Sequence, residues 1–531
     1  MSPFGNVPLL YIVLGVAVVS VLVAVVGTWP VCVLLLRAYR RRIERGMRLS
    51  ATTEPPPTPL LPAAAALRPI AVREIEVAQG HPLLARARLR ARRTVLVFCV
   101  AGAAYAGAAT AAFSLVDPGG WSALRVVAYL VLTGWPLVPT VLALTPRARR
   151  LKVLVHAGYL AVALALLGLA GVRLDEVLVV VVVPGVFMLA LGARPLRGAA
   201  WLVAPGLAVL TAAVLALVLP AVYLFHAAPF DVYAWSFLAT GIGLLVLLVA
   251  YGWALARSYA AKWASDQTLL VLQWWLVASV CWSLLLGTQG GEAALLGLAP
   301  YAVFVVVLLG GALVARPDPT PAVRLLLLRT FGSRQRSSRL LYDLTRQWRW
   351  LGSVELITGP DLASEILEPD EFLDFLLGRT ERRFVRDPGA LPRVLSELDL
   401  RTDRDGRFRV NELLCYSDTW QPAVAGLISA VDAVVMDLRG LTVGNAGVVR
   451  ELELLVAQVP LSRVVALVDA STDQSALRWA LDRAARLAPP SSPLVSDPAP
   501  ELRVVVLSVG GSDRPERLIA AVAAAAASTA G

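Results

Sequence analysis

The residues best placed to do chemistry lie between Asp437 and Glu451. The apolar strand predicted at 433–438 contains Asp437 near its end, a glycine-rich loop follows, and a helix then carries Glu451. Glycines let backbone N–H groups approach an anion, and a helix N-terminus favours negative charge. Two carboxylates over one cleft could bind ribose hydroxyls, or attack or stabilise an anomeric carbon. We interpret the loop between them as a ligand-binding group, with Arg439, Gly440, Asn445 and Gly447 as its binding residues.

A parallel sheet is needed to position these residues. Strands are predicted at 323–329, 354–358, 433–438, 463–469 and 503–508, and helices at 336–350, 369–378, 418–430, 446–458, 473–487 and 514–527. Residues 395–400 and 407–415 flank an Asp-Gly turn and predict an inserted β-hairpin. The alternation predicts an α/β, doubly wound, flavodoxin-like domain over 323–531. Ligands bind outside the carboxyl ends of such strands, which adds Arg329 and Thr330 to the binding group.

The order of strand with Asp437, glycine loop and helix with Glu451 resembles the TIR-like and nucleoside 2-deoxyribosyltransferase-like domains. The helix that begins with Asp418-Thr-Trp420, before this strand, is similar to the TIR-like arrangement. The resemblance covers roughly residues 323–510. It implies a flavodoxin-like fold, NAD or another nucleotide as ligand, Glu451 as nucleophile or ribose-binding acid, and Asp437 as its helper. If the domain is an enzyme, the resemblance implies cleavage of an N-glycosidic bond in NAD or a nucleoside.

The chain departs from this family pattern in two ways. The predicted hairpin is an insertion that the family does not have. Arg329-Thr-Phe-Gly332 follows the first strand, where TIR domains have a Ser-Tyr pattern. These departures bear on catalysis more than on the fold.

Several other chemistries are excluded by composition. The three histidines all precede residue 316, so the C-terminal domain has neither a Ser-His-Asp triad nor histidine metal ligands. The four cysteines have no metal-binding spacing, and no GxxxxGK[ST] motif is present. We therefore expect no metal site.

The first part of the chain is a different kind of domain. Long apolar stretches predict an α-helical polytopic membrane domain over 1–316 with about nine spans. The spans are expected at 8–36, 94–116, 123–144, 152–172, 176–193, 198–224, 234–256, 268–288 and 293–315. A Pro-rich spacer, 317–322, joins it to the α/β domain.

The charge distribution predicts how the chain is oriented. Residues 1–315 carry 23 Lys/Arg and 10 Asp/Glu, whereas 316–531 carry 26 and 28. The excess of +13 falls in alternate short loops, so we expect the N-terminus outside and the C-terminal domain in the cytoplasm of a multi-pass cell-membrane protein. The excess of basic residues thus reflects the orientation of the chain in the membrane, and no nucleic-acid partner is expected.

A long cytoplasmic loop is expected at 37–93. It contains two arginine clusters, 37–48 and 86–93, around a proline-rich linker at 50–69, and the first cluster is expected to continue the first helix. The clusters either fix the topology or bind anionic lipid.

Three functions are compatible with this architecture. The first is a bacterial membrane protein whose TIR-like domain binds a nucleotide in a signalling or effector role. The second is a non-enzymatic membrane scaffold or signalling protein whose α/β domain docks a partner. The third is a transporter with a regulatory domain. A homo-oligomer formed through the cytoplasmic domain is compatible with each of these functions. The predicted spans have no acidic residue near their middle, which argues against proton or cation coupling.

Overall fold

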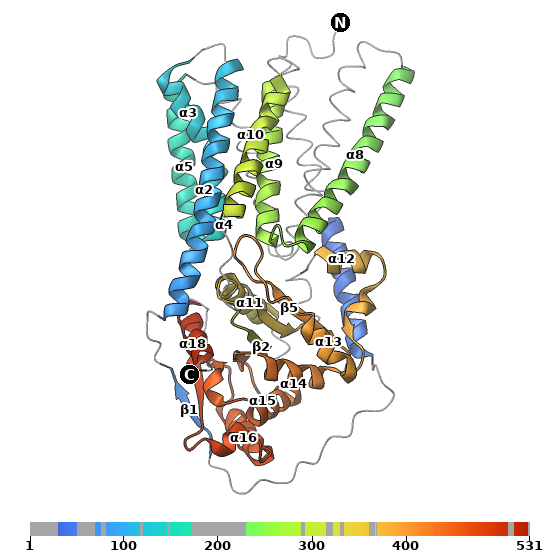
Figure 1. Ribbon diagram of the computed structural model, residues 1–531, viewed down its shortest axis with the longest axis vertical. Helices are drawn as coiled ribbons and strands as arrows, with labels where there is room; N and C mark the ends of the chain where they lie inside the picture. Colours follow the sequence, from blue (N-terminus) through green and yellow to red (C-terminus); the bar gives the residue numbers. More distant parts are fainter. Residues whose placement is uncertain are drawn as a thin grey trace. The chain divides into compact units, whose positions relative to one another are not determined.

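The computed structural model describes most of the chain, in two compact units. The described residues are 30–49, 69–75, 81–116, 121–145, 149–171, 230–287, 293–314, 322–329, 334–359, 367, 369–507 and 515–528. The first unit comprises Met1–Leu36, Ala91–Pro317 and Glu368–Asp370. The second comprises Arg37–Arg90, Asp318–Leu367 and Glu371–Gly531. Figure 1 shows a helical part and an α/β part.

The first unit is helical. Its elements are α2 (Pro82–Val116, from residue 91 on), α3 (Ala123–Gly134), α4 (Leu137–Leu144), α5 (Arg149–Leu169), α8 (Phe230–Ala260), α9 (Asp266–Gly287) and α10 (Ala293–Val314). Within the described residues, three helices are long and apolar enough to cross a membrane, at Pro82–Val116, Ala123–Leu142 and Leu296–Val314.

The structure does not support the predicted count of nine spans. The apolar part of α5, Val153–Leu169, is shorter than the roughly 20 residues that a bilayer requires. The predicted span 234–256 lies within α8, and residues 268–287 of the predicted span 268–288 lie within α9. Those at 176–193 and 198–224, with most of 8–36, lie outside the described residues.

Aromatic and small residues pack the described helices of this unit closely. The Trp275 ring lies 4.7 Å from that of Tyr105 and 4.5 Å from that of Phe304, which joins α9 to α2 and α10. A Cβ built on Gly297 of α10 would lie 2.3 Å from the Cα of Ser283 on α9. Close backbone approach at small residues is typical of helix pairs in membranes.

The second unit is built on an eight-stranded sheet. The strands are β1 (Ala71–Glu74), β2 (Leu325–Arg329), β3 (Val354–Ile357), β4 (Phe384–Val385), β5 (Val410–Cys415), β6 (Ala433–Asp437), β7 (Val464–Val468) and β8 (Glu501–Val506). Their order is β1-β8-β7-β6-β2-β3-β5-β4, and each neighbouring pair is parallel. Every residue of β2, β3, β6 and β7 is buried, as a sheet covered on both faces requires.

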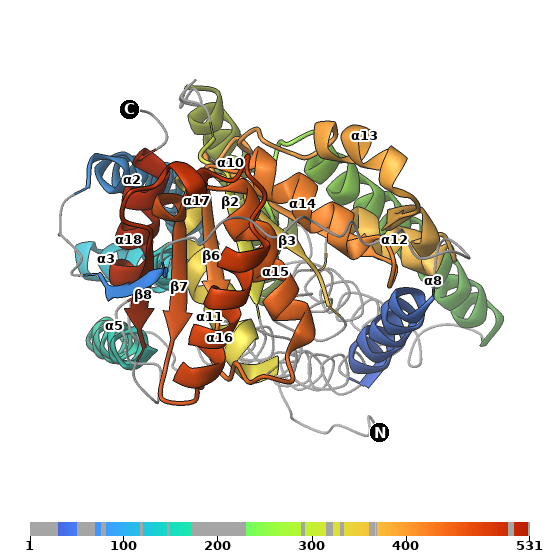
Figure 2. The same cartoon turned by 90° about the horizontal axis from the view of Figure 1, so that it is seen from below.

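Two groups of helices cover this sheet. Helices α14 (Trp420–Ala430), α15 (Ala446–Gln458) and α16 (Gln474–Leu487) contact one another in sequence order, and α11 (Arg334–Trp348) contacts α18 (Pro515–Ala527). Figure 2 shows the central strands side by side with the helices alongside. The remaining described elements are α12 (Pro369–Leu376), η2 (Thr380–Arg383), η3 (Pro388–Ala390), α13 (Leu391–Ser396), η4 (Leu461–Arg463) and α17 (Pro493–Ser496). The predicted parallel sheet with helices is confirmed.

The predicted hairpin is wrong. Its turn exists, because Gly406 has a φ of +82° and its N–H donates to the carbonyl of Asp403 at 2.9 Å. The segment before the turn is not a strand, since α13 ends at Ser396 and an irregular stretch follows. Leu395 and Leu398 pack against the core there, and β5 pairs in parallel with β3 and β4.

The segment Arg37–Arg90 falls in the α/β unit. Residues 30–48 are helical, which agrees with the expectation that 37–48 continues the first helix. Strand β1, which the sequence did not predict, extends the sheet beside β8. Residues 50–68, most of the predicted linker, lie outside the described residues.

Candidate functional site

The candidate site lies where the direction of strand addition reverses. From β2 the chain first adds β3, on one side, and later adds β6 on the other side of β2. The last residues of these two central strands, Arg329 and Asp437, are register partners. Ligands of open parallel sheets bind outside the carboxyl ends at such a reversal. Arg329 lies at this edge of the sheet, whereas Thr330 lies outside the described residues.

Asp437 is held by Arg439, two residues further on. The Arg439 guanidinium donates from Nε to Oδ1 at 2.7 Å and from Nη2 to Oδ2 at 2.6 Å, and its backbone N–H donates to Oδ1 at 3.2 Å. Burial alone would lower the pKa of Arg439, but Asp437 and Asp469 hold it above its usual value. A bidentate pair of this kind neutralises both groups. Asp437 therefore acts first as the partner of Arg439, and a direct role on a ligand would require that pair to open.

Glu451 has the most perturbed environment of the predicted site residues. Glu451 lies on α15 and is only 4% exposed, and its Oε2 atom has no hydrogen-bond partner. Burial raises its pKa to about 8, and the nearby positive charge of Arg329 offsets part of that rise. At neutral pH the carboxyl group is mainly protonated, so it is a hydrogen-bond donor or general acid rather than a ready nucleophile.

The two carboxyl groups have different partners. The Arg439 guanidinium pairs with Asp437, whereas the positive charge of Arg329 acts on Glu451. Leu328 and Met436 pack in the core that contains Val448 and Leu452 of α15. Side chains alternate along a strand, so Arg329 and Asp437, which follow them and are register partners, share the opposite face of the sheet. The structure therefore associates Glu451 with Arg329, and Asp437 with Arg439.

The loop between β6 and α15 is fixed by its own side chains. Asn445 accepts from the Thr442 N–H at 2.7 Å and from the Thr442 hydroxyl at 2.9 Å, and makes no side-chain cap on α15. Gly440 has a φ of +75°, the conformation for which glycine is suited. A Cβ on Gly447 would meet nothing within 4 Å, so packing does not require glycine there. Gly447 and the preceding residue are exposed, which leaves the start of α15 accessible.

Sequence reasoning did not identify the supporting loop after β7. The Thr472 hydroxyl donates to the carbonyl of Leu438 at 3.2 Å, and the Asp473 N–H donates to that of Leu441 at 3.1 Å. These bonds join the loops at the ends of β6 and β7. The position of Asp469 at a strand end was visible in the sequence, but nothing there indicated which loop its neighbours would bind.

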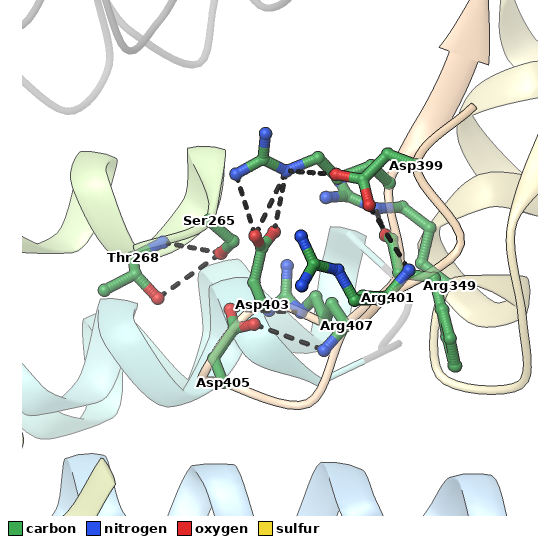
Figure 3. Close-up of polar contacts among 10 residues, drawn as sticks. Ser265, Thr268, Arg349, Asp399, Arg401, Asp403, Asp405 and Arg407 are labelled. Atoms are coloured by element: carbon green, nitrogen blue, oxygen red, sulfur yellow. Dashed lines mark hydrogen bonds and ion pairs between the residues drawn. The ribbon is translucent and has the colours of Figure 1, made fainter. Parts of the chain in front are cut away.

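A second polar cluster lies in the segment predicted as the hairpin (Figure 3). Arg409 donates to Asp403 at 2.8 Å through Nη2, and its Nε lies 3.7 Å from Asp399. Burial and the neighbouring Asp405 raise the pKa of Asp403 to about 7, although Arg409 and Arg349 act against that rise. Because each carboxylate faces an arginine, this cluster holds the segment in place rather than presenting a free reactive group.

In the described part of the chain, no group of three or more His, Cys, Asp or Glu side chains could hold a metal ion. No protein-family model, no curated protein and no solved structure matches the chain.

Proposed function

We propose that the chain is a multi-pass membrane protein whose α/β unit binds a nucleotide-type ligand beside Arg329 and Glu451, in a signalling or effector role. The five strands β3-β2-β6-β7-β8 follow the order of flavodoxin-like sheets, and Arg329 ends the strand at the reversal. This order and the Glu451 helix support the TIR-like assignment. The N-terminus is outside and the α/β unit cytoplasmic in this proposal, on the charge balance of +13 before residue 316 and −2 after it.

The observation that carries the proposal is the buried carboxyl of Glu451. A buried polar atom without a hydrogen bond costs free energy, so its presence calls for a reason. A ligand hydroxyl next to Oε2 would supply the missing bond. A protonated carboxyl beside a guanidinium suits a ligand with hydroxyls and negative charge, and ribose phosphates combine the two.

Catalysis would place a further demand on Glu451. To act at the anomeric carbon, the carboxyl must be ionised, and with a pKa of about 8 roughly a tenth is ionised at pH 7. A cationic nicotinamide ring would favour ionisation. In cleavage, the electrons of the C–N bond return to the ring nitrogen, Glu451 stabilises or attacks C1′, and water supplies the new hydroxyl. Such activity should rise with pH toward 8.

The test uses the full chain in detergent. We expect NAD, ADP-ribose or a nucleoside to raise the melting temperature of the α/β unit, with a smaller rise for Glu451→Ala. Glu397→Ala is the matched control, because Glu397 is a carboxylate with an exposed side chain that pairs with Arg393. Product analysis with the same ligands separates binding from cleavage. No stabilisation of the unsubstituted chain by any of these ligands would refute the proposal and favour a scaffold without a nucleotide site.

A further inference from the structure

The helix over residues 30–48 has one buried and one exposed face from Arg37 on, where it belongs to the α/β unit. Tyr39 and Ile43 are 1% and 0% exposed. The Tyr39 ring lies 5.4 Å from that of Phe375, and a Cβ on Gly46 would lie 2.5 Å from the ring of Phe384. The opposite stripe is exposed and consists of Arg37, Arg41, Arg45 and Arg48.

A second exposed patch lies beside this helix, where α12 ends. Leu376 and Leu377 are 54% and 60% exposed, and Arg379 and Arg382 after them are exposed as well. Gly378, with a φ of +71°, turns the chain between the leucines and the arginines. The patch is joined to the helix through Phe375, which contacts Tyr39, and through an ion pair of 2.9 Å between Arg42 and Glu381.

We propose that these residues form one surface that binds the anionic headgroups of the bilayer, with the two leucines inserted among them. The surface, here the Arg–Leu surface, comprises Arg37, Arg41, Arg45, Arg48, Leu376, Leu377, Arg379 and Arg382. Exposed leucines framed by basic side chains are typical of segments that lie in a membrane interface.

Position along the chain favours lipid as the partner. The apolar stretch 8–36 ends three residues before Tyr39, and three residues of helix rise about 4.5 Å. Phe375, which contacts Tyr39, is followed directly by the exposed leucines. A role in topology alone needs only charge in a loop. It explains neither the exposed leucines nor the fixed orientation of the arginine stripe, whose reverse face is buried in the unit.

The experiment places a nitroxide label at Leu377→Cys in the full chain, reconstituted in nanodiscs. One set contains phosphatidylcholine alone and the other phosphatidylcholine with phosphatidylglycerol. Collision with oxygen reports lipid, and collision with a water-soluble nickel chelate reports water. The unsubstituted chain is the labelling control, because its free cysteines, Cys32, Cys99, Cys281 and Cys415, are buried or half-buried. We expect lipid-like accessibility in the anionic nanodiscs and water-like accessibility in the neutral ones.

Charge variants test the arginines directly. Arg41→Gln and Arg45→Gln should each lower the ratio of inserted to free label by about fivefold in anionic nanodiscs, the effect of one basic residue near such a surface. Arg393→Gln is the matched control, since its side chain is 82% exposed outside the Arg–Leu surface, and should leave the ratio unchanged. A label that stays water-accessible in both lipids overturns the proposal. So does equal insertion in both, or protection from both probes, which would indicate a protein partner.

Discussion

Replacing Glu451 by glutamine should make the α/β unit more stable as pH rises, relative to the unsubstituted chain. Glutamine has nearly the same shape but cannot ionise. The pKa of Glu451 is raised from its ordinary 4.5 to about 8 in the folded chain, by burial. The folded chain therefore retains the Glu451 proton up to about pH 8, whereas the unfolded chain releases it near pH 4.5.

The sign and size of the effect follow from this difference. Below about pH 4.5 both states are protonated, so the burial of Glu451 carries no ionisation cost. Between pH 4.5 and 8 the unfolded chain ionises and the folded chain does not, and stability falls by about 1.4 kcal/mol per pH unit. Between pH 5 and 8 the variant should gain about 3 to 4 kcal/mol over the unsubstituted chain.

Cys415 offers an assay specific to this unit in the full chain. It is 1% exposed, and burial raises its pKa to about 12, so it reacts with thiol reagents only when the unit opens. Its labelling under increasing denaturant, followed by mass spectrometry, gives the opening free energy at each pH. The labelling rate of the same chain in full denaturant corrects for the pH dependence of the thiol.

A difference between variant and unsubstituted chain that stays constant from pH 5 to 8 would show that Glu451 ionises normally. The argument for a buried acid at the site would then fail. A further variant checks the cause: Arg329 lowers the pKa of Glu451 in the folded chain, so Arg329→Gln should extend the fall in stability to higher pH, with its start near pH 4.5 unchanged.

Three further predictions concern the frame of the α/β unit. Glu453→Ala should cost about 2 kcal/mol, because this buried carboxylate accepts from two arginines at 2.6 and 2.8 Å; the Cys415 assay measures it. Gly352→Ala should lower the free energy of unfolding by about 3 kcal/mol or more, since the new Cβ would lie 1.7 Å from a backbone carbonyl oxygen. Gly447→Ala is the comparison, because a Cβ there meets nothing within 4 Å, and it should be neutral or stabilising by up to about 1 kcal/mol. Arg73→Pro should speed hydrogen exchange in β8 by at least about tenfold, because backbone N–H groups alternate in direction along a strand and that of Arg73 points toward β8. Val72→Pro is the control, since the N–H of Val72 points away from β8 and its loss should not change the exchange. Equal effects of the two substitutions would contradict the pairing of β1 with β8.

Most of the α/β core is predictable because its strands and helices are locally encoded. The runs Leu325–Leu328, Ala433–Met436 and Val464–Val468 are continuously apolar, as strands buried on both faces must be, and the helices between them lie close to the predicted ranges. The prediction of a hairpin was wrong because Asp405-Gly406 specifies a turn but not the structure of the segment before the turn. Packing of Leu395 and Leu398 against the core decides that, and such packing is not visible in local sequence.

The sequence indicates which edge of the sheet to consider but not how the charged groups there are paired. Strand ends and glycines indicate the edge where Arg329 and Asp437 end their strands. Arg439, two residues after Asp437, binds its carboxylate, whereas Glu451 is buried by the packing of α15. The sequence shows two carboxyl groups, and only the fold shows that one pairs with an arginine whereas the other is buried with no hydrogen bond at its Oε2 atom.

The contribution of residues 37–90 changes what can be called the α/β domain. A cut before residue 323 would remove β1 from the sheet edge and would expose the rings of Phe375 and Phe384, which pack on the helix ending at residue 48. The four residues of β1, Ala-Val-Arg-Glu, are exposed and carry two charges, so no local pattern marks them as a strand. Their pairing with β8, more than 400 residues later, is a long-range contact that the continuous backbone of β8 makes possible. The α/β unit is therefore assembled from segments that precede and follow the apolar helices in the sequence, and its stability and the proposed ligand and lipid binding should be measured in the full chain.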